Sequence, residues 1–379
     1  MNSRGLVVPT FAVGVGGAFL QIAGANWDVS SHVLGIVDTF FTPPHLVLYV
    51  GILLALVAGV LGVLIIRPKG EDEQLGLGFE VSLAGSTIQL VAAPLDFWWH
   101  EAFGFDPFLF TPTHSMLIVG LALCGIGMTT GVMRLLRRDG STRSLKLLGT
   151  LSLATIWLDL NFLVLWLINA QGVAYTFRIC SPEAIYARSC DFVGLYETAA
   201  YLPALLLDAL GGAVVFLLAK SLLGWRGALT FPAAILVAVN AAANLGFSAY
   251  MLLFVGVPGS FYFNGPTAAA GANLASIIPF YVALLVPVAL IDLLMRREHR
   301  GALIAASLAA GPLSVFLDGR FSTFSGLWSP GLEILVYLLP MAAGGLLGGW
   351  LGKRVALALV PGHRGGAPIS TGATQMVGG

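Results

Sequence analysis

Charged residues are scarce in this chain. The 19 Lys and Arg and the 19 Asp and Glu make up 10% of its 379 residues, whereas about 25% is usual in soluble domains. Hydrophobic residues reach 57% and the mean hydropathy is +0.89, which excludes an ordinary soluble domain and predicts an integral membrane protein. The formal net charge is zero, so no nucleic-acid partner is expected, and the lipid bilayer is the expected surrounding.

Cysteine is also rare, with three residues in the whole chain. Cys124 lies within an apolar run, which predicts a buried and unreactive thiol. Cys180 and Cys190 share one polar stretch on the predicted outer side. A structural disulfide between them is favoured over two free thiols, because an outer segment can be oxidised.

Apolar runs, in contrast, fill the chain. Each is close to the roughly 20 residues that cross a bilayer as a helix, and together they predict an all-α, polytopic bundle of about ten transmembrane helices. We expect a single transmembrane domain over residues 1–355 and a disordered cytoplasmic tail over 356–379, which is rich in Gly, Ser and Thr. The predicted spans are 6–25, 45–66, 75–94, 114–133, 147–169, 198–219, 228–254, 268–294, 302–318 and 331–351.

The distribution of Lys and Arg predicts the orientation. With ten spans in a cell membrane and both termini cytoplasmic, only Arg178, Arg188 and Arg320 of the 19 Lys and Arg fall on the outer side. The excess of Lys and Arg on the cytoplasmic side agrees with the positive-inside rule. The segments that follow the first and third spans then lie at the outer face.

These two outer segments repeat each other and hold four of the six histidines. A shift of 68 residues aligns one Asp-x3-His pair with the other, and one inserted residue then aligns a later histidine. Each repeat unit, about 6–66 and 75–133, is predicted as a helix, an outer connecting segment and a returning helix. The aligned residues are Asp28, His32 and His45 in the first copy and Asp96, His100 and His114 in the second.

One carboxylate and two imidazoles form a metal-ligand set that suits copper, iron or zinc. An Asp and a His four residues apart share one helix face, and the prolines before the last histidine of each copy favour the start of the next helix. The spacing leaves open one dinuclear site or two mononuclear sites, with two slightly favoured. Capping of helix ends is the alternative role for the histidines. Asp38 and Asp106 could be ligands, could orient an imidazole or could lie in turns.

The first copy reads Asp-x3-His-x5-Asp-x2-Phe-Thr-Pro-Pro-His from Asp28 to His45. This run resembles the metal-binding motif in one membrane subunit of the copper membrane monooxygenases, the particulate methane and ammonia monooxygenase family. The resemblance implies copper, oxidation of a small apolar substrate with dioxygen, and other membrane subunits as partners. This chain departs from the family in its greater number of predicted spans and its duplicated motif. It also has Asn240-x3-Asn244 where the family has an Asn-x3-His pair.

Two further functions remain open from the residues alone: a copper or zinc transporter or metal-delivery protein, and a zinc-dependent membrane hydrolase. The pattern assigns no catalytic residue, and homo-oligomerisation is also possible.

Asp159 and Asp208 fall in the middle of predicted spans, where a carboxyl group is costly and indicates either function or hydrogen bonding between helices. Asn161 is one predicted hydrogen-bond partner, and the side chains at 240 and 244 are others.

Overall fold

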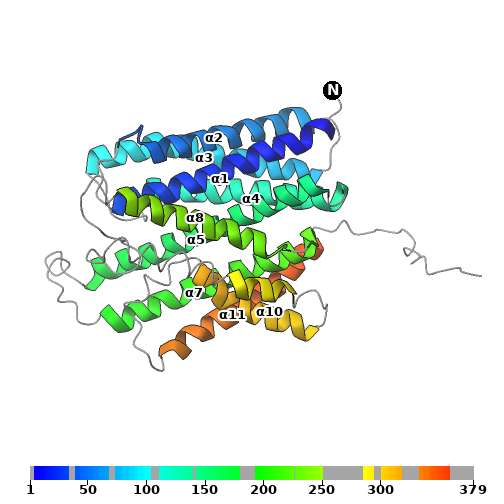
Figure 1. The fold of residues 1–379 in the computed structure, drawn as a ribbon. Helices are drawn as coiled ribbons and strands as arrows, with labels where there is room; N and C mark the ends of the chain where they lie inside the picture. The colour runs from blue at the N-terminus through cyan, green and yellow to red at the C-terminus, as the bar shows by residue number, and fades with distance from the viewer. Residues whose placement is uncertain are drawn as a thin grey trace, which may run out of the picture.

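The computed structural model describes residues 4–33, 39–67, 73–103, 111–139, 142–179, 193–225, 227–250, 285–293, 300–317 and 333–358, which contain helices and no strand. The labelled elements are α1 (Arg4–Val33), α2 (Pro43–Leu61), η1 (Gly62–Ile66), α3 (Glu73–Phe103), α4 (Pro112–Asp139), α5 (Arg143–Ile179), α7 (Val193–Leu223), α8 (Thr230–Tyr250), α10 (Arg300–Leu317) and α11 (Glu333–Ala358). The helices run side by side as an elongated bundle (Figure 1).

The prediction of a multi-pass helical membrane protein is confirmed by length and composition. Among the described residues, six helices are long and apolar enough to cross a membrane. The count of ten spans stays a prediction. The six segments are Gly5–Asp28, Pro43–Ile66, Leu75–Phe103, Pro112–Asp139, Arg143–Val164 and Leu202–Leu223.

Two helices extend beyond the spans predicted from hydropathy. The first span was expected to end at residue 25, but α1 runs to Val33, and the third was expected to end at residue 94, but α3 runs to Phe103. Hydropathy falls where aromatic and polar side chains begin, whereas the backbone hydrogen bonds of a helix continue regardless of that change. The Asp-x3-His pairs therefore lie within helices and not in connecting segments.

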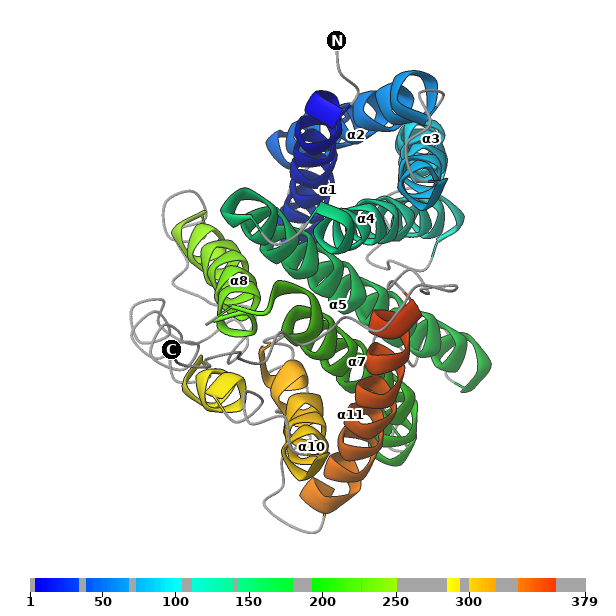
Figure 2. The same cartoon turned by 90° about the vertical axis from the view of Figure 1, so that its right-hand side faces the viewer.

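Helices α1 to α4 form a four-helix unit in which both hairpins are built alike (Figure 2). Helix α1 packs on α2 and α4, and α3 packs on α4 and α2. Gly17 meets the backbone of Gly51 within the first hairpin, and Gly85 meets the backbone of Gly120 in the second. Small residues permit such close approach of helices in membranes. The two pairs occupy equivalent positions of the repeat, so the duplication extends along the whole hairpins.

Aromatic rings mark the contact between the two hairpins. The rings of Phe11 and Phe79 stack with centroids 4.1 Å apart and planes 21° apart. These residues are also separated by the 68 residues of the repeat. Phe11 and Phe79 are thus equivalent residues that contact each other, which is the arrangement expected at a pseudo-two-fold axis.

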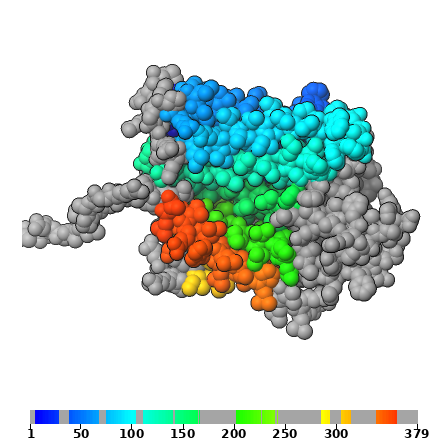
Figure 3. Space-filling model, turned by 180° about the vertical axis from the view of Figure 1, so that it is seen from behind, coloured from blue at the N-terminus to red at the C-terminus, as the bar shows by residue number. Residues whose placement is uncertain are grey.

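Helix α5 joins the four-helix unit to the remaining helices. It packs against α1 and α4 on one side and against α7 and α8 on the other, while α7, α10 and α11 pack together (Figure 2). Large apolar side chains on the outside, such as Leu64, Leu90 and Leu339 at 67%, 55% and 71% exposure, give the bundle a lipid-compatible surface. Figure 3 shows the α2 to α4 surface and the α11 surface on one side of the molecule.

Candidate metal centre

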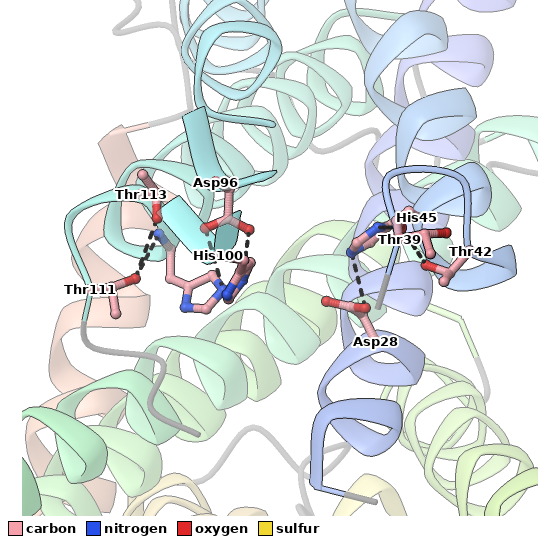
Figure 4. A network of polar contacts seen from close by, with 9 residues as sticks. Asp28, Thr39, Thr42, His45, Asp96, His100, Thr111 and Thr113 are labelled. Atoms are coloured by element: carbon pink, nitrogen blue, oxygen red, sulfur yellow. Dashed lines mark hydrogen bonds and ion pairs between the residues drawn. The ribbon is translucent and has the colours of Figure 1, made fainter. Parts of the chain in front are cut away.

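The second copy of the motif forms a compact group of three ligand residues. Asp96 and His100 lie on one face of the last turns of α3 (Figure 4), and His114 lies in the first turn of α4. One ligand atom from each residue lies within 4.8 Å of the other two. The repeat predicted this convergence, and the structure brings all three residues together.

The Asp96 carboxylate stands between the two imidazoles. Its Oδ2 is 3.6 Å from His100 Nε2 and its Oδ1 is 3.4 Å from His114 Nε2. The two imidazole rings are 5.3 Å apart between centroids. Asp96 and His114 are only 8% and 7% exposed, so the group is shielded from water, and a charge placed there is screened little.

These separations are longer than strong hydrogen bonds and are compatible with a shared cation. A strong N–H···O bond to a carboxylate is about 2.7–2.9 Å long, which is shorter than both contacts. Ligand atoms that each lie about 2.1 Å from an ion at tetrahedral angles are separated by about 3.4 Å. The 3.4 Å and 3.6 Å contacts of Asp96 are therefore close to the spacing of ligands around one metal ion.

Threonine residues fix the beginning of α4 and so the position of His114. The Thr111 side-chain hydroxyl accepts a hydrogen bond from the His114 backbone N–H at 3.3 Å, as an N-cap does. Pro112 follows at the first helical position, where its missing N–H costs nothing. The Thr113 hydroxyl lies 3.4 Å from that of Thr111. This cap directs the histidine toward α3.

The first copy places its last histidine in the same way. His45 lies in the first turn of α2 behind Pro43 and Pro44, and its Nε2 is 3.1 Å from Asp28 Oδ1 on α1 (Figure 4). Its other ring nitrogen, Nδ1, lies 2.9 Å from the Thr39 carbonyl oxygen. Since a carbonyl oxygen can only accept, Nδ1 carries the proton in that bond.

The protonation of Nδ1 determines the nature of the Asp28–His45 contact. In a neutral imidazole whose Nδ1 is protonated, Nε2 has only a lone pair, and that lone pair faces a carboxylate oxygen. At 3.1 Å, two acceptors need a proton on one of the two groups or a metal ion between them. Histidines that bind metals characteristically donate their other ring N–H to a carbonyl or carboxylate, as His45 does to Thr39.

Several predicted residues fall outside the described part of the chain. His32 lies on α1, but its side chain is outside the described residues, and Asp38, Asp106, Cys180 and Cys190 are outside them altogether. The predicted burial of Cys124 is confirmed, because it is 0% exposed. Trp27 and Trp98 lie beside the two sites and are 49% and 57% exposed.

The two intramembrane aspartates are buried, at 3% exposure for Asp159 and 4% for Asp208. The predicted Asp159–Asn161 hydrogen bond is absent from the described residues, and neither side chain has a hydrogen-bond partner there. Residues two apart in a helix point to nearly opposite sides, which explains why this pair does not form. The alternative partners Asn240 and Asn244 have side chains outside the described residues.

An apolar groove between the two copies was missed by sequence reasoning. Its volume is about 560 Å³ and its walls are Thr39, Phe40, Phe41, Pro94, Phe97 and Glu101. Phe40 and Phe97 meet edge to face, with centroids 5.6 Å apart, so that the two copies form the groove together. The aromatic residues next to each ligand were the available signal, because Phe97 directly follows Asp96.

Comparison with protein-family models, with curated proteins and with solved structures returns no match for this chain. Its function must therefore be inferred from the residues of the two sites.

Proposed function

We propose that this chain is an integral membrane metalloprotein that binds copper at the Asp96, His100 and His114 group and at the equivalent Asp28, His32 and His45 positions. The observation that carries the proposal is the Asp96 carboxylate, which stands 3.6 Å and 3.4 Å from two imidazole nitrogens in a buried group. Two imidazoles and one carboxylate suit copper, iron or zinc. The resemblance of the motif to that of the copper membrane monooxygenases favours copper.

The proposed reaction is oxidation of a small apolar substrate with dioxygen. Bound copper supplies oxygen activation in such chemistry. The residues of this chain have separate tasks. With copper bound, His100 and His114 would present ring nitrogens as ligands and Asp96 would supply negative charge between them, while the cap at Thr111 holds His114 in position. Burial limits the access of water to the group.

The groove supports the apolar character of the substrate. Phe40, Phe41 and Phe97 form most of its wall, and Thr39 connects it with the first site because its carbonyl accepts the His45 ring proton. A groove with aromatic walls beside two ligand sites suits a small apolar molecule that partitions from the bilayer. As in the family it resembles, the chain could act together with other membrane subunits or as a homo-oligomer.

Metal analysis and electron paramagnetic resonance of the purified protein test this proposal. After reconstitution with copper, we expect bound Cu²⁺ with nitrogen hyperfine structure, and we expect His100→Ala to lose the signal of the second copy. His363→Ala serves as the control, since this residue lies outside both motifs. Equal copper content in wild type and His100→Ala would contradict the site. A preparation that holds only zinc would contradict the oxygenase function.

Metal transport or delivery is the second candidate function. Buried polar side chains continue inward from the site along α3, at Gln89, Ser86 and Ser82, which favours a path for a cation. Against copper(I) transport, Cys124 and Met128 are the only thiol and thioether four residues apart in the sequence. Metal uptake into proteoliposomes without oxygen consumption would support transport, whereas substrate-dependent oxygen consumption without uptake would support the oxygenase.

A further inference from the structure

Helix α5 carries a buried carboxyl group within a membrane span. Asp159 lies within the span Arg143–Val164 and is 3% exposed. Neither of its carboxylate oxygens has a hydrogen-bond partner among the described residues. A buried carboxylate without a partner is costly, and the usual response of such a group is to bind a proton.

The carboxyl group packs directly on the next helix. Asp159 Oδ2 lies against the Cα of Gly125 in α4, so closely that a methyl group at this position would overlap it. Gly125 follows Cys124, whose thiol lies 3.3 Å from Ser86 Oγ and 3.4 Å from the Ser82 carbonyl oxygen. Asp159 therefore borders a polar region shared by α3 and α4.

Two relationships align Asp159 with the metal group. Gly125 follows His114 by eleven residues on α4, which is close to three full turns and about 16 Å along the helix axis. On α5, Trp166 follows Asp159 by seven residues, close to two turns, and donates a hydrogen bond of 3.0 Å to Ser115 Oγ. Ser115 is the neighbour of His114, so the face of α5 that carries Asp159 leads to the metal group.

Few ionisable side chains lie on the helices around Asp159. Helix α5 packs against α1, α4, α7 and α8, and the described side chains of α8 include no ionisable group. In the middle of the others, α4 has Cys124 and α7 has Asp208. Nearer to helix ends the described ionisable side chains are Asp28 on α1, His114, Arg134, Arg137, Arg138 and Asp139 on α4, Arg143 and Lys146 on α5, and Lys220 on α7.

We propose that Asp159 is a proton-binding site coupled to the Asp96, His100 and His114 group. The carboxyl group holds a proton while the group is empty. When a divalent cation binds there, the O–H bond of Asp159 breaks, its proton passes to the outer aqueous phase, and the carboxylate remains. The added positive charge favours the carboxylate because the buried region between them screens charge weakly. This inference rests on the proposed metal binding.

Labelling with dicyclohexylcarbodiimide, an apolar reagent for protonated carboxyl groups, tests the proposal on the full chain in detergent. The protonated acid adds across the carbodiimide, and the O-acylisourea rearranges to a stable N-acylurea that peptide mass spectrometry locates. Zn²⁺ is the probe, because it has no redox chemistry. Without metal we expect labelling at Asp159, and with Zn²⁺ a decrease of roughly tenfold or more.

Three controls keep the outcome interpretable. His114→Ala should be labelled equally with and without Zn²⁺, and labelling of Asp208 should not respond to metal in any variant. Asp159→Asn should lose the label and keep its Zn²⁺ content. If Asp159→Asn does not fold, Asp159→Glu should retain labelling that responds to metal.

Two results would overturn the proposal: no label at Asp159 in the metal-free protein, or equal labelling with and without Zn²⁺ in a protein that binds the ion. Failure of the proposed function has a different pattern. In that case no Zn²⁺ binds, while Asp159 is still labelled. Such a result would contradict metal binding, and with it the coupling, but it would still show that Asp159 binds a proton.

Discussion

Gln89 donates a side-chain hydrogen bond of 2.9 Å to Gln21 Oε1, and the two residues occupy the same position in the two copies of the repeat. Gln21 in turn donates to the Gly51 carbonyl oxygen at 3.1 Å. Each glutamine lies seven residues, close to two helical turns, before the aspartate of its own motif. The Asp-x3-His pairs of the two motifs thus lie on α1 and α3, and the hydrogen bond between Gln89 and Gln21 joins these helices inside the bundle.

Replacing either glutamine should lower the free energy of unfolding, and replacing both should lower it by less than the sum of the two single effects. Gln21→Leu or Gln89→Leu leaves a buried amide without its partner, at about 1–3 kcal/mol each, and the double variant should show a coupling of about 0.5–2 kcal/mol. Thermal unfolding in detergent measures the cycle. The control is Thr87→Val, because Thr87 is exposed on the same helix. Strict additivity would mean that the contact carries no energy.

The two hairpins should respond alike to substitutions at equivalent glycines. A methyl group at Gly131 would overlap the ring of Phe11, and one at Gly62 would overlap the ring of Phe79. We expect Gly131→Ala and Gly62→Ala to destabilise the protein by about 1–3 kcal/mol each, as overpacking does. The unfolding midpoint measures this, and Gly16→Ala is the control, since nothing lies within 4 Å of its new methyl group.

A rescue experiment separates steric overlap from other causes. Phe11→Leu should restore stability to Gly131→Ala and not to Gly62→Ala, because only the first pair is in contact. Phe79→Leu should do the reverse. Rescue of both glycine variants by either substitution would contradict the pairwise contacts.

The two copies should bind metal independently. The first copy places Asp28 3.1 Å from His45, and the second forms its own group around Asp96. We expect two copper ions per chain, one of which is lost in His45→Ala and the other in His114→Ala. Metal content by mass spectrometry, with paramagnetic resonance of each variant, measures this. Loss of both ions from either single variant would instead indicate one dinuclear site.

Much of the candidate site was predictable from the sequence, because its ligand residues are close together in the chain or occur in both copies of the repeat. Asp96 and His100 are one helical turn apart, and the repeat with its prolines indicated that His114 begins the next helix. The contact between Gln21 and Gln89 and that between Asp159 and Gly125 were not predicted. Both depend on how neighbouring helices pack, and hydropathy says nothing about which faces meet. Gln21 and Gln89 could have been found by extending the 68-residue alignment inward.

The predicted orientation is testable through the cysteines. If both termini are cytoplasmic, Cys180 and Cys190 face the outside. After mild reduction of intact cells, a membrane-impermeant maleimide should label these two residues and leave Cys124, which is 0% exposed, unlabelled. Cys180→Ser with Cys190→Ser is the control that should abolish labelling. Labelling only in inverted vesicles would reverse the orientation and move the metal motifs to the cytoplasmic side.

The cap of α4 should matter for metal affinity, and the repeat supplies its own control. The Thr111 hydroxyl accepts the His114 backbone N–H, whereas the equivalent Thr42 makes no side-chain cap bond in α2. Thr111→Val keeps the shape of the side chain and removes this acceptor, so the first turn of α4 loosens and His114 is held less firmly. We expect a decrease in copper affinity of about 10-fold at the second copy, the lower end of the range for groups that orient a ligand. Thr42→Val should change the affinity of the first copy less.

Titration against a competing chelator measures each affinity. The His45→Ala background isolates the second site and the His114→Ala background isolates the first. An equal loss in both variants would show that the threonines act through something other than the N-cap bond.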